Sequence, residues 1–495
     1  MKTNTISGLA ALPILAACSA QGVERSNVVY IMTDQQSYYM ISAITNSLDP
    51  ASPYANNHYF KTPNLDRLVK NGYTFSNCYA AHPVSGPSRY ALLTGESPNS
   101  VGMTGNFSPQ GENGERIRSI ITSRAMGTLF KNAGYQTYYG GKVHLAWADG
   151  NRQINDKPVN YGFDNYLTED DREELAQKGA EFFSTYDSKE PFLLFLSFMN
   201  PHDICNTQIL FSDRQLEDFE SLRDKPFTEA SLDWRSRVNE LAWRDVYSTM
   251  DKTLFEGEEL AKLTSNREPT DRFPLRYTRQ RFRLDDYNLR VHLWFYYRLM
   301  EQVDAEIGQV LDALEKSPYK DNTIIVFTSD HGDMAGSHGY TGKNLPYEEC
   351  QKIPLIFVGK GVKKGVIDNK TPVCNGWDML PTLLDMAGLE IPEELHGLSL
   401  YKNMTTGEPV NRKYLYYETV NSYGVMEDGK YKYTRFVPSN FSELADGNEM
   451  LFDLEKDPGE LHNLVFDPAY AAKLNELRAA LDKETALRGI TLQER

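Results

Sequence analysis

Four apolar segments of the sequence end in side chains that could bind a cation or move a proton. These side chains are Asp34 with Gln35, Lys142 with His144, His202, and Asp330 with His331. A single Asp in such a place is usually a helix cap, and a single His is usually structural. Ligands of an open α/β sheet bind outside the carboxyl ends of its strands, so four such ends on one rim favour an active site.

The donor set offers mostly oxygen atoms. Asp34, Gln35, Asp330 and His331 suit a hard cation such as Ca²⁺ or Mg²⁺, whereas a zinc site would carry more His or Cys. Such a cation could hold an anionic ester oxygen as a Lewis acid. Lys142 and Lys343 would add fixed positive charge, although either lysine alone is more simply interpreted as a solvated surface cation.

A serine stands at the start of a predicted helix in "HPVSGPSRYALLTG", residues His82 to Gly95. Pro87 fits a first helical turn and Gly95 a helix end, so Ser85 is expected just before the helix, where backbone N–H groups attract anions. A plain N-cap is the alternative role for Ser85, and this stretch alone does not decide between the two.

The elements that would position these residues follow a βαβ pattern. Near-continuous apolar runs indicate strands buried on both faces. The predicted strands are Asn27–Asp34, Tyr135–His144, Pro191–His202, Asn322–His331 and Ile353–Gly359. Predicted helices cover Thr62–Gly72, with Thr62 as its cap, a stretch with Val303, Ile307, Val310, Leu311 and Leu314 on one face, and Asp378–Pro392.

The composition of the sequence changes after about residue 400, where short Tyr-rich segments alternate with predicted turns. A hairpin is predicted over Tyr423–Phe436 around Asp428 and Gly429, followed by a helix capped by Asp467 that runs to about Leu487. We therefore expect an α/β fold with a large, mostly parallel sheet flanked by helices, over residues 24–400. A smaller C-terminal subdomain, an antiparallel sheet plus helix, is expected over residues 401–495.

Composition excludes some classes of protein. The formal net charge is −16 and no basic stripe dominates, which argues against a nucleic-acid partner. The long stretch from Ile204 to Asn288 is charged and aromatic, and we interpret it as insertions near the mouth of the site. Its basic run could meet an anionic group of a ligand, but such a run is more often a solvated face. The run comprises Arg272, Arg276, Arg279, Arg281 and Arg283.

The N-terminus reads as a secretory signal over residues 1–20, with Lys2 before an apolar core. "LAAC" resembles a bacterial lipobox that would place a lipid on Cys18, whereas small residues also suit cleavage after Ala20. The expected location is the periplasm or the outer membrane of a Gram-negative bacterium, with membrane contact only through that lipid. The remaining four cysteines are too scattered for a disulfide framework.

The motifs together resemble the type I, formylglycine-dependent sulfatases of the alkaline phosphatase superfamily. The family signature of Cys or Ser, any residue, Pro, Ser, Arg and a helix ending in Thr-Gly stands here as Ser85 to Arg89 and Thr94-Gly95. The resemblance extends through "TDQQ", "GGKVH", "NPHD", "SDHGDMAGSHGYTGK", "DMLPTLLDMAG" and "LFDLEKDPGELHNL". It implies an alkaline-phosphatase-like fold and hydrolysis of sulfate esters.

In that family the signature residue is oxidised to formylglycine, whose hydrate attacks sulfur with one hydroxyl and expels sulfate through the other. An unmodified serine would remain a stable sulfate ester after one turnover. The resemblance makes Ser85 the precursor, with maturation by an anaerobic radical-type enzyme. A deliberate Cys-to-Ser change would look the same in the sequence.

The resemblance also assigns roles to the other residues. Arg89 and Lys142 would hold the formylglycine and sulfate, His144 would assist the diol, His202 would protonate the leaving alcohol, and Lys343 would contact the sulfate. Calcium would be held by Asp34, Gln35, Asp330 and His331. Gln35 departs from the commoner Asp, and "PHD" departs from the commoner Pro-His-x-Pro. His338 could point into the site or fix its own loop.

Secretion favours an extracellular sulfated carbohydrate as substrate, such as a glycosaminoglycan or mucin fragment. Two alternatives remain open: a phosphonate monoester or phosphodiester hydrolase of the same superfamily, and a catalytically silent glycan-binding lipoprotein in which Ser85 is never converted. A comparison of aryl sulfate and aryl phosphonate hydrolysis distinguishes a sulfatase from the first alternative. Mass spectrometry of Ser85 tests the second, because the silent protein would keep an ordinary serine.

Overall fold

Four neighbouring parallel strands form the middle of the central sheet. Their order is β7 (Thr323–Ser329), β1 (Asn27–Asp34), β5 (Phe192–Pro201) and β3 (Gln136–Gly141). Val28 of β1 pairs with Ile324 on one side and Leu193 on the other, which fixes the register. These are four of the five predicted strands, and their carboxyl ends lie on one rim.

We describe the fold from a computed structural model. It describes residues 25–50, 52, 54, 55, 59–146, 157–205, 275–277, 286–437, 442–444 and 448–490, with the backbone alone for residues 275–277, 286–288, 290, 291 and 442–444. The signal segment and most of the predicted insertion after Ile204 lie outside these residues, as do the side chains of the basic run. No helix among the described residues is long and apolar enough to cross a membrane.

Nine strands of the described residues form the central sheet. The sheet is mostly parallel, as predicted. The fifth predicted strand, β8 (Lys352–Val358), is antiparallel to both of its neighbours, β7 and β2 (Tyr73–Tyr79). The sequence analysis did not identify β2, because Thr74, Ser76 and Asn77 interrupt its apolar run although the whole strand is buried. The sheet is completed by β4 (Asn165–Tyr166), β9 (Val366–Asp368) and β10 (Val373–Cys374).

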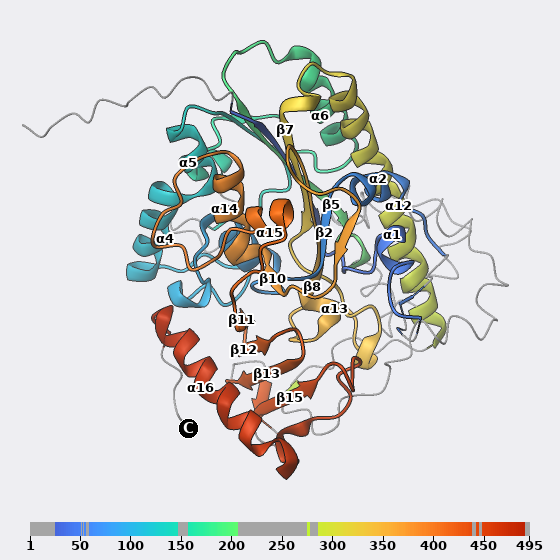
Figure 1. Ribbon diagram of the computed structural model, residues 1–495, viewed down its shortest axis with the longest axis vertical. Helices are drawn as coiled ribbons and strands as arrows, with labels where there is room; N and C mark the ends of the chain where they lie inside the picture. Colours follow the sequence, from blue (N-terminus) through green and yellow to red (C-terminus); the bar gives the residue numbers. More distant parts are fainter. Residues whose placement is uncertain are drawn as a thin grey trace, which may run out of the picture.

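Helices cover both faces of the sheet (Figure 1). Side chains alternate along a strand, so Val28 and Tyr30 of β1 enter one core while Val29 and Ile31 enter the other. The first core is covered by α3 (Ser85–Thr94), α4 (Gly111–Arg124), α5 (Met126–Asn132) and α14 (Asn375–Met386). The second is covered by α2 (Pro63–Asn71), α6 (Glu173–Thr185) and α12 (Asp286–Lys316).

The predicted helices are present with shifted ends. The helix predicted from residue 378 begins three residues earlier, at Asn375, and the apolar face with Val303 and Ile307 lies on α12. Thr62 is the N-cap residue of α2, as predicted, but its side chain makes no capping bond. Its Oγ1 instead accepts a 2.8 Å hydrogen bond from the backbone N–H of Ser42.

A separate four-stranded antiparallel sheet follows, at the lower end of Figure 1. It consists of β11 (Tyr414–Glu418), β12 (Ser422–Glu427), β13 (Tyr431–Phe436) and β15 (Glu449–Asp453). The predicted turn joins β12 to β13, with φ of 51° at Asp428 and 69° at Gly429. Asp467 accepts a hydrogen bond from Ala469 in a short turn, and α16 (Ala471–Leu487) then packs on the sheet.

The predicted division after residue 400 stays a prediction. Helix α15 (Tyr401–Thr406) still contributes Met404 to the core of the large sheet, and the antiparallel sheet starts only at Tyr414.

The other short elements are α1 (Ser42–Thr45), α13 (Glu348–Gln351), β6 (Leu275–Tyr277) paired with β14 (Ser442–Leu444), and the 3-10 turns η1 (Asn99–Val101), η2 (Pro158–Tyr161), η5 (Lys320–Asn322), η6 (Ser337–Gly339), η7 (Leu464–Phe466) and η8 (Pro468–Tyr470).

Candidate active site

The carboxyl rim of the four parallel strands brings the predicted polar residues together. Asp34 is the last residue of β1, and Asp330 with His331 directly follows β7. His202 directly follows β5. Lys142 follows Gly141 of β3, whose φ of 85° and 2.3 Å approach of a built Cβ to Ser197 O leave no room for a side chain. The tight turn at Gly141 thus carries the chain directly into Lys142.

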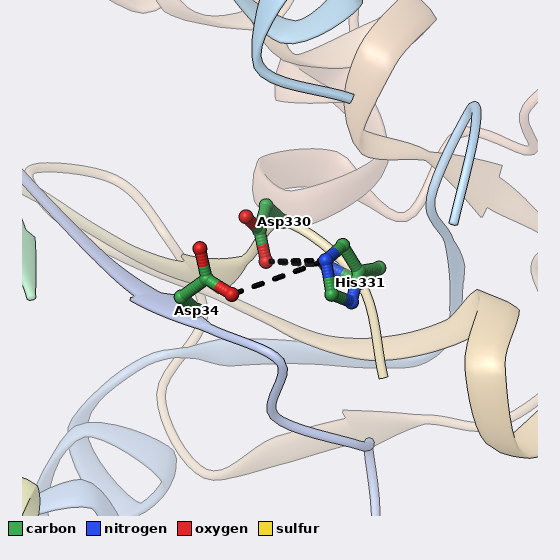
Figure 2. A group of neighbouring side chains, drawn as sticks. All are labelled: Asp34, Asp330 and His331. Carbon is green, nitrogen blue, oxygen red and sulfur yellow. Dashed lines mark hydrogen bonds and ion pairs between the residues drawn. The ribbon is translucent and has the colours of Figure 1, made fainter. Parts of the chain in front are cut away.

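Asp34, Asp330 and His331 form a compact group of metal-type ligands (Figure 2). One ligand atom from each lies within 4.8 Å of the others, and all three side chains are fully buried. His331 Nδ1 lies 2.9 Å from Gly332 O. Because a carbonyl only accepts, Nδ1 carries the proton and Nε2 is left with a lone pair toward the carboxylates.

Gln35 is oriented so that its amide oxygen faces the same site. Its Nε2 donates to Asp333 Oδ2 at 2.6 Å, and its Oε1 accepts from Lys343 Nζ at 3.0 Å and from Cys205 Sγ at 3.2 Å. Asp333 therefore fixes which end of the amide points to the rim. Two carboxylates, one amide oxygen and one neutral imidazole fit a hard divalent cation.

Ser85 is the first residue of α3, one position later than expected. The N-cap is Val84 and Ser85 makes no capping bond, so the capping alternative is wrong. Its hydroxyl instead lies 3.0 Å from His331 Nε2, 3.2 Å from Asp34 Oδ2 and 3.3 Å from Lys343 Nζ. The serine is thus at the centre of the charged group, at the N-terminus of a ten-residue helix.

Arg89 lies one helical turn after Ser85 and is 1% exposed. Its Nε donates to Asp330 Oδ2 at 3.0 Å, and its Nη2 donates to Asp34 Oδ2 at 2.9 Å. Its Nη1 donates to Ser197 Oγ and to Lys142 O. The guanidinium therefore bridges the two carboxylates and ties them to the ends of β3 and β5.

The carboxylates differ in their protonation behaviour. Burial would raise the pKa of Asp34, but Lys142, His202, Lys343 and Arg89 outweigh it and hold that pKa well below its usual range. Burial and the charge of Asp34 raise the pKa of Asp330 to about 6. Lys142 Nζ lies 2.6 Å from Asp34 Oδ2, so one ammonium is already directed at the group.

Burial and the nearby Lys142 ammonium lower the pKa of both His144 and His202 well below the usual range of histidine. Both rings are therefore neutral near pH 7 in the free enzyme. His144 has a φ of 46°, a backbone conformation that costs energy in a non-glycine residue and is concentrated at functional sites.

His338 does not join this site. Its ring stacks on Tyr347 with centroids 3.8 Å apart, and it lies with Glu349 and Glu460 in a second buried group. Lys432 Nζ is 2.9 Å from Glu460 Oε1, so an ammonium already neutralises that carboxylate. Of the two roles considered for His338, fixing its own loop is the one the structure supports.

Asp333, Ser197 and Cys205 contact the predicted residues but were not singled out in the sequence. "SDHGD" carried a partial signal for Asp333, which follows Asp330 and His331 in the same motif. Nothing in the sequence pairs Ser197 with Arg89 or Cys205 with Gln35, because those contacts depend on the order of strands in the sheet.

A mostly parallel sheet with carboxylates, a neutral imidazole and lysines at its carboxyl rim defines an α/β enzyme with a metal-type site. The sulfatase family model matches residues 26–389, and a model described as N-sulphoglucosamine sulphohydrolase, C-terminal, matches residues 336–486. The chain belongs to the sulfatase family and is a sulfuric ester hydrolase. Members of this family generally use a formylglycine and a divalent metal.

Relatives match along almost the whole chain. An N-acetylglucosamine-6-O-sulfatase of Bacteroides thetaiotaomicron is 29% identical, with 98% of this chain and 91% of the relative covered. A Delta 4,5-hexuronate-2-O-sulfatase of the same species is 28% identical, covering 94% and 90%. A solved structure in complex with its substrate D-glucosamine-2-N,6-O-disulfate shares the fold, with a TM-score of 0.66, 24% identity, and 94% and 98% covered.

Proposed function

We propose that this sulfatase removes sulfate from an extracellular sulfated saccharide of the glycosaminoglycan or mucin type, using a formylglycine formed from Ser85. The position of the Ser85 hydroxyl carries this proposal, because it lies within 3.3 Å of His331, Asp34 and Lys343 and caps no helix. The names of the matched relatives, which act on amino-sugar and uronate sulfates, support a carbohydrate substrate.

A formylglycine at position 85 would supply a hydrated aldehyde that attacks sulfur and later releases sulfate. We propose Ca²⁺ as the metal, held by Asp34, Gln35, Asp330 and His331, where it would act as a Lewis acid on the sulfate. Conversion of the serine removes two hydrogens, and we assign that oxidation to an anaerobic radical-type maturation enzyme of the host.

The chain's own residues would then bind and orient the ester. Arg89 keeps Asp34 and Asp330 in place through its hydrogen bonds to both carboxylates. Lys142 and Lys343 would direct their ammonium groups at the sulfate oxygens. This local positive charge is needed because the chain as a whole is acidic and would otherwise repel an anionic substrate. His144 lies near Lys142 and would accept a proton from the nucleophile. His202, which is neutral in the free enzyme, would take up a proton when the anionic ester binds and then deliver it to the departing sugar oxygen.

We further propose that the protein acts after export, as a periplasmic or outer-membrane-anchored enzyme with a lipid on Cys18. The signal-like composition of the first 20 residues supports this proposal. Globomycin, which blocks lipoprotein signal cleavage, tests it: retention of the uncleaved chain supports lipidation, and unchanged processing contradicts it.

A substrate panel tests the proposed activity. The protein purified from its native host would be assayed on five compounds: N-acetylglucosamine 6-O-sulfate, D-glucosamine-2-N,6-O-disulfate, a uronate 2-O-sulfate, 4-nitrophenyl sulfate and 4-nitrophenyl phenylphosphonate. Turnover of a sugar sulfate supports the proposal. Turnover of the phosphonate alone would establish the phosphonate hydrolase alternative, and tight sugar binding without turnover would establish the silent binding protein.

A further inference from the structure

One short segment contacts the chain on both sides of His202. The backbone carbonyl of Asp171 accepts a 2.9 Å hydrogen bond from Met199, three residues before His202. The side chain of Arg172, the next residue, binds Asp203, directly after His202. The turn that carries the proposed general acid is therefore held from one segment at two points.

The Arg172–Asp203 contact is bidentate. Arg172 Nε lies 3.1 Å from Asp203 Oδ2, and Nη2 lies 2.9 Å from Oδ1 and 3.0 Å from Oδ2. The side chains are only 20% and 9% exposed, so solvent weakens the pair little. Two parallel charged hydrogen bonds fix the planes of both groups, which a lysine in place of the arginine could not do.

Arg172 is itself held firmly. Asp170 Oδ1 accepts hydrogen bonds from the backbone N–H groups of Arg172, at 2.9 Å, and Glu174, at 3.1 Å, at the start of α6. Arg172 Nη1 also donates to Asp171 Oδ1 at 2.6 Å. Leu175 of α6 and Leu196 of β5 lie in the same hydrophobic core, so the segment at the start of α6 is packed against the strand that precedes His202.

The hydrogen bonds within the turn are local. His202 N donates to Met199 O at 3.1 Å, and Cys205 N donates to His202 O at 2.9 Å. Such bonds set the turn's shape but not its direction relative to the rim. Two contacts outside the turn supply that direction: Asp203 with Arg172, and Cys205 Sγ with Gln35 Oε1 at 3.2 Å. The Arg172 contact also neutralises the Asp203 carboxylate, whose charge would disfavour an anionic ester near the turn.

We infer that Arg172 and Asp203 are positioning residues that aim His202 at the departing sugar oxygen. This inference rests on the proposed function, in which His202 is the general acid. It also gives a physical role to Asp203, which occupies the variable position of the family pattern Pro-His-x-Pro. A misplacement of about 1 Å in a reacting group can cost on the order of 100-fold in rate.

The test compares Arg172→Ala, Arg172→Lys, Asp203→Asn and the double variant R172A/D203A with His202→Ala. Each matured enzyme is assayed on the sugar sulfate that the wild type turns over best and on 4-nitrophenyl sulfate. We expect R172A to lower kcat on the sugar sulfate by about 10- to 100-fold, with KM changed less than about threefold and aryl sulfate turnover lowered less than about threefold.

The double variant should lose no more than R172A alone, because both changes remove one shared interaction. Arg172→Lys should recover only part of the sugar sulfate activity. Arg67→Ala removes a partly exposed partner of Asp312, far from the described site in sequence, and serves as the control variant, with no expected change in activity. Melting temperatures identify any variant that fails to fold. If R172A does not fold, the same comparison of the two substrates is made with Asp203→Asn, which keeps the shape of the side chain.

Equal losses of R172A on both substrates, a rise in KM alone, or no loss would each overturn the inference. If His202→Ala itself affects both substrates equally, the general-acid role falls and the inference falls with it. If His202→Ala discriminates between the substrates while R172A does not, only the positioning role is wrong. The absence of any sugar sulfate turnover beside aryl sulfate turnover would contradict both.

Discussion

Arg89 Nε lies 3.0 Å from Asp330 Oδ2, and the same guanidinium reaches Asp34 Oδ2 through Nη2 at 2.9 Å. All three groups are buried, so the arginine balances two carboxylates that would otherwise repel each other in a low-dielectric interior. Arg89 belongs to the same helix as Ser85, so this helix links the proposed nucleophile precursor to the metal-type ligands.

Replacement of Arg89 by methionine should destabilise the fold strongly. Methionine is also unbranched but carries no charge, so Asp330 loses its hydrogen-bonded guanidinium and Asp34 keeps the nearby Lys142 ammonium. We expect a loss of about 3–5 kcal/mol in the free energy of unfolding. Urea unfolding of metal-free protein measures it. The partly exposed control Arg67→Ala should cost less than about 1 kcal/mol, and an equally small loss for Arg89→Met would contradict the bridging role.

Asp333→Asn should weaken calcium binding although Asp333 faces the site only through Gln35. The carboxylate accepts hydrogen bonds from Gln35 Nε2, Ala335 N and Gly342 N, and an amide cannot accept from all three donors. We expect about a tenfold loss of calcium affinity, measured by isothermal titration after chelation with EGTA.

EGTA treatment should abolish sulfate ester hydrolysis, and added calcium should restore it. Asp312→Asn, at an exposed position, is the control for the titration and should bind calcium as the wild type does. Full activity in the chelated wild type would exclude a catalytic role for the metal. Unchanged calcium affinity in Asp333→Asn would exclude the role of Asp333 in orienting Gln35.

Glu306 on α12 should make the fold less stable as the pH rises. Burial raises the pKa of Glu306 from 4.5 to about 7, and its Oε2 has no hydrogen-bond partner among the described residues. Between these values the folded state keeps a proton that the unfolded state has lost, so the stability conferred by this proton is present at low pH and disappears as the pH rises through 7.

Glu306→Gln should therefore remove a pH-dependent loss on the order of 2 kcal/mol between about pH 5 and about pH 8. Its amide still accepts from Gln302 Nε2, as Glu306 Oε1 does at 3.1 Å. Urea unfolding at both pH values measures the difference. Identical pH dependence in wild type and variant would show that Glu306 does not titrate in this range.

His202→Ala should reduce turnover of sugar sulfates far more than turnover of 4-nitrophenyl sulfate. A sugar alkoxide is a poor leaving group and needs a proton, whereas 4-nitrophenolate scarcely does. We expect about a 100-fold or larger loss on the sugar and less than about a tenfold loss on the aryl ester. Parallel losses on the two substrates would remove His202 from the acid role.

Much of the fold could be predicted from the sequence because the buried parallel strands are almost continuously apolar. The prediction for Asn27–Asp34 matches β1 at both ends. Strand β2 was missed since Thr74 and Ser76 are polar yet buried, and polarity alone cannot distinguish them from loop residues. The N-cap position of Thr62 was predicted, but its contact with Ser42, which replaces the local capping bond, was not.

The rim residues could be predicted because they follow strands, but their partners could not. The contact between Gln35 and Asp333 needs β1 and β7 to be neighbours, which the structure shows and hydrophobic periodicity does not. The Arg172–Asp203 pair likewise joins the start of α6 to the turn after β5. Such contacts depend on strand order, which is a property of the whole chain.

Peptide mass spectrometry across Ser85 tests the central claim most directly. The protein would be purified from its native host under anaerobic conditions, with sulfatase activity measured on the same sample and Ser85→Ala as the inactive control. The account predicts that the active protein carries a residue lighter than serine by two hydrogens, or its hydrate. An intact serine at position 85 in a protein that turns over sulfate esters would contradict it.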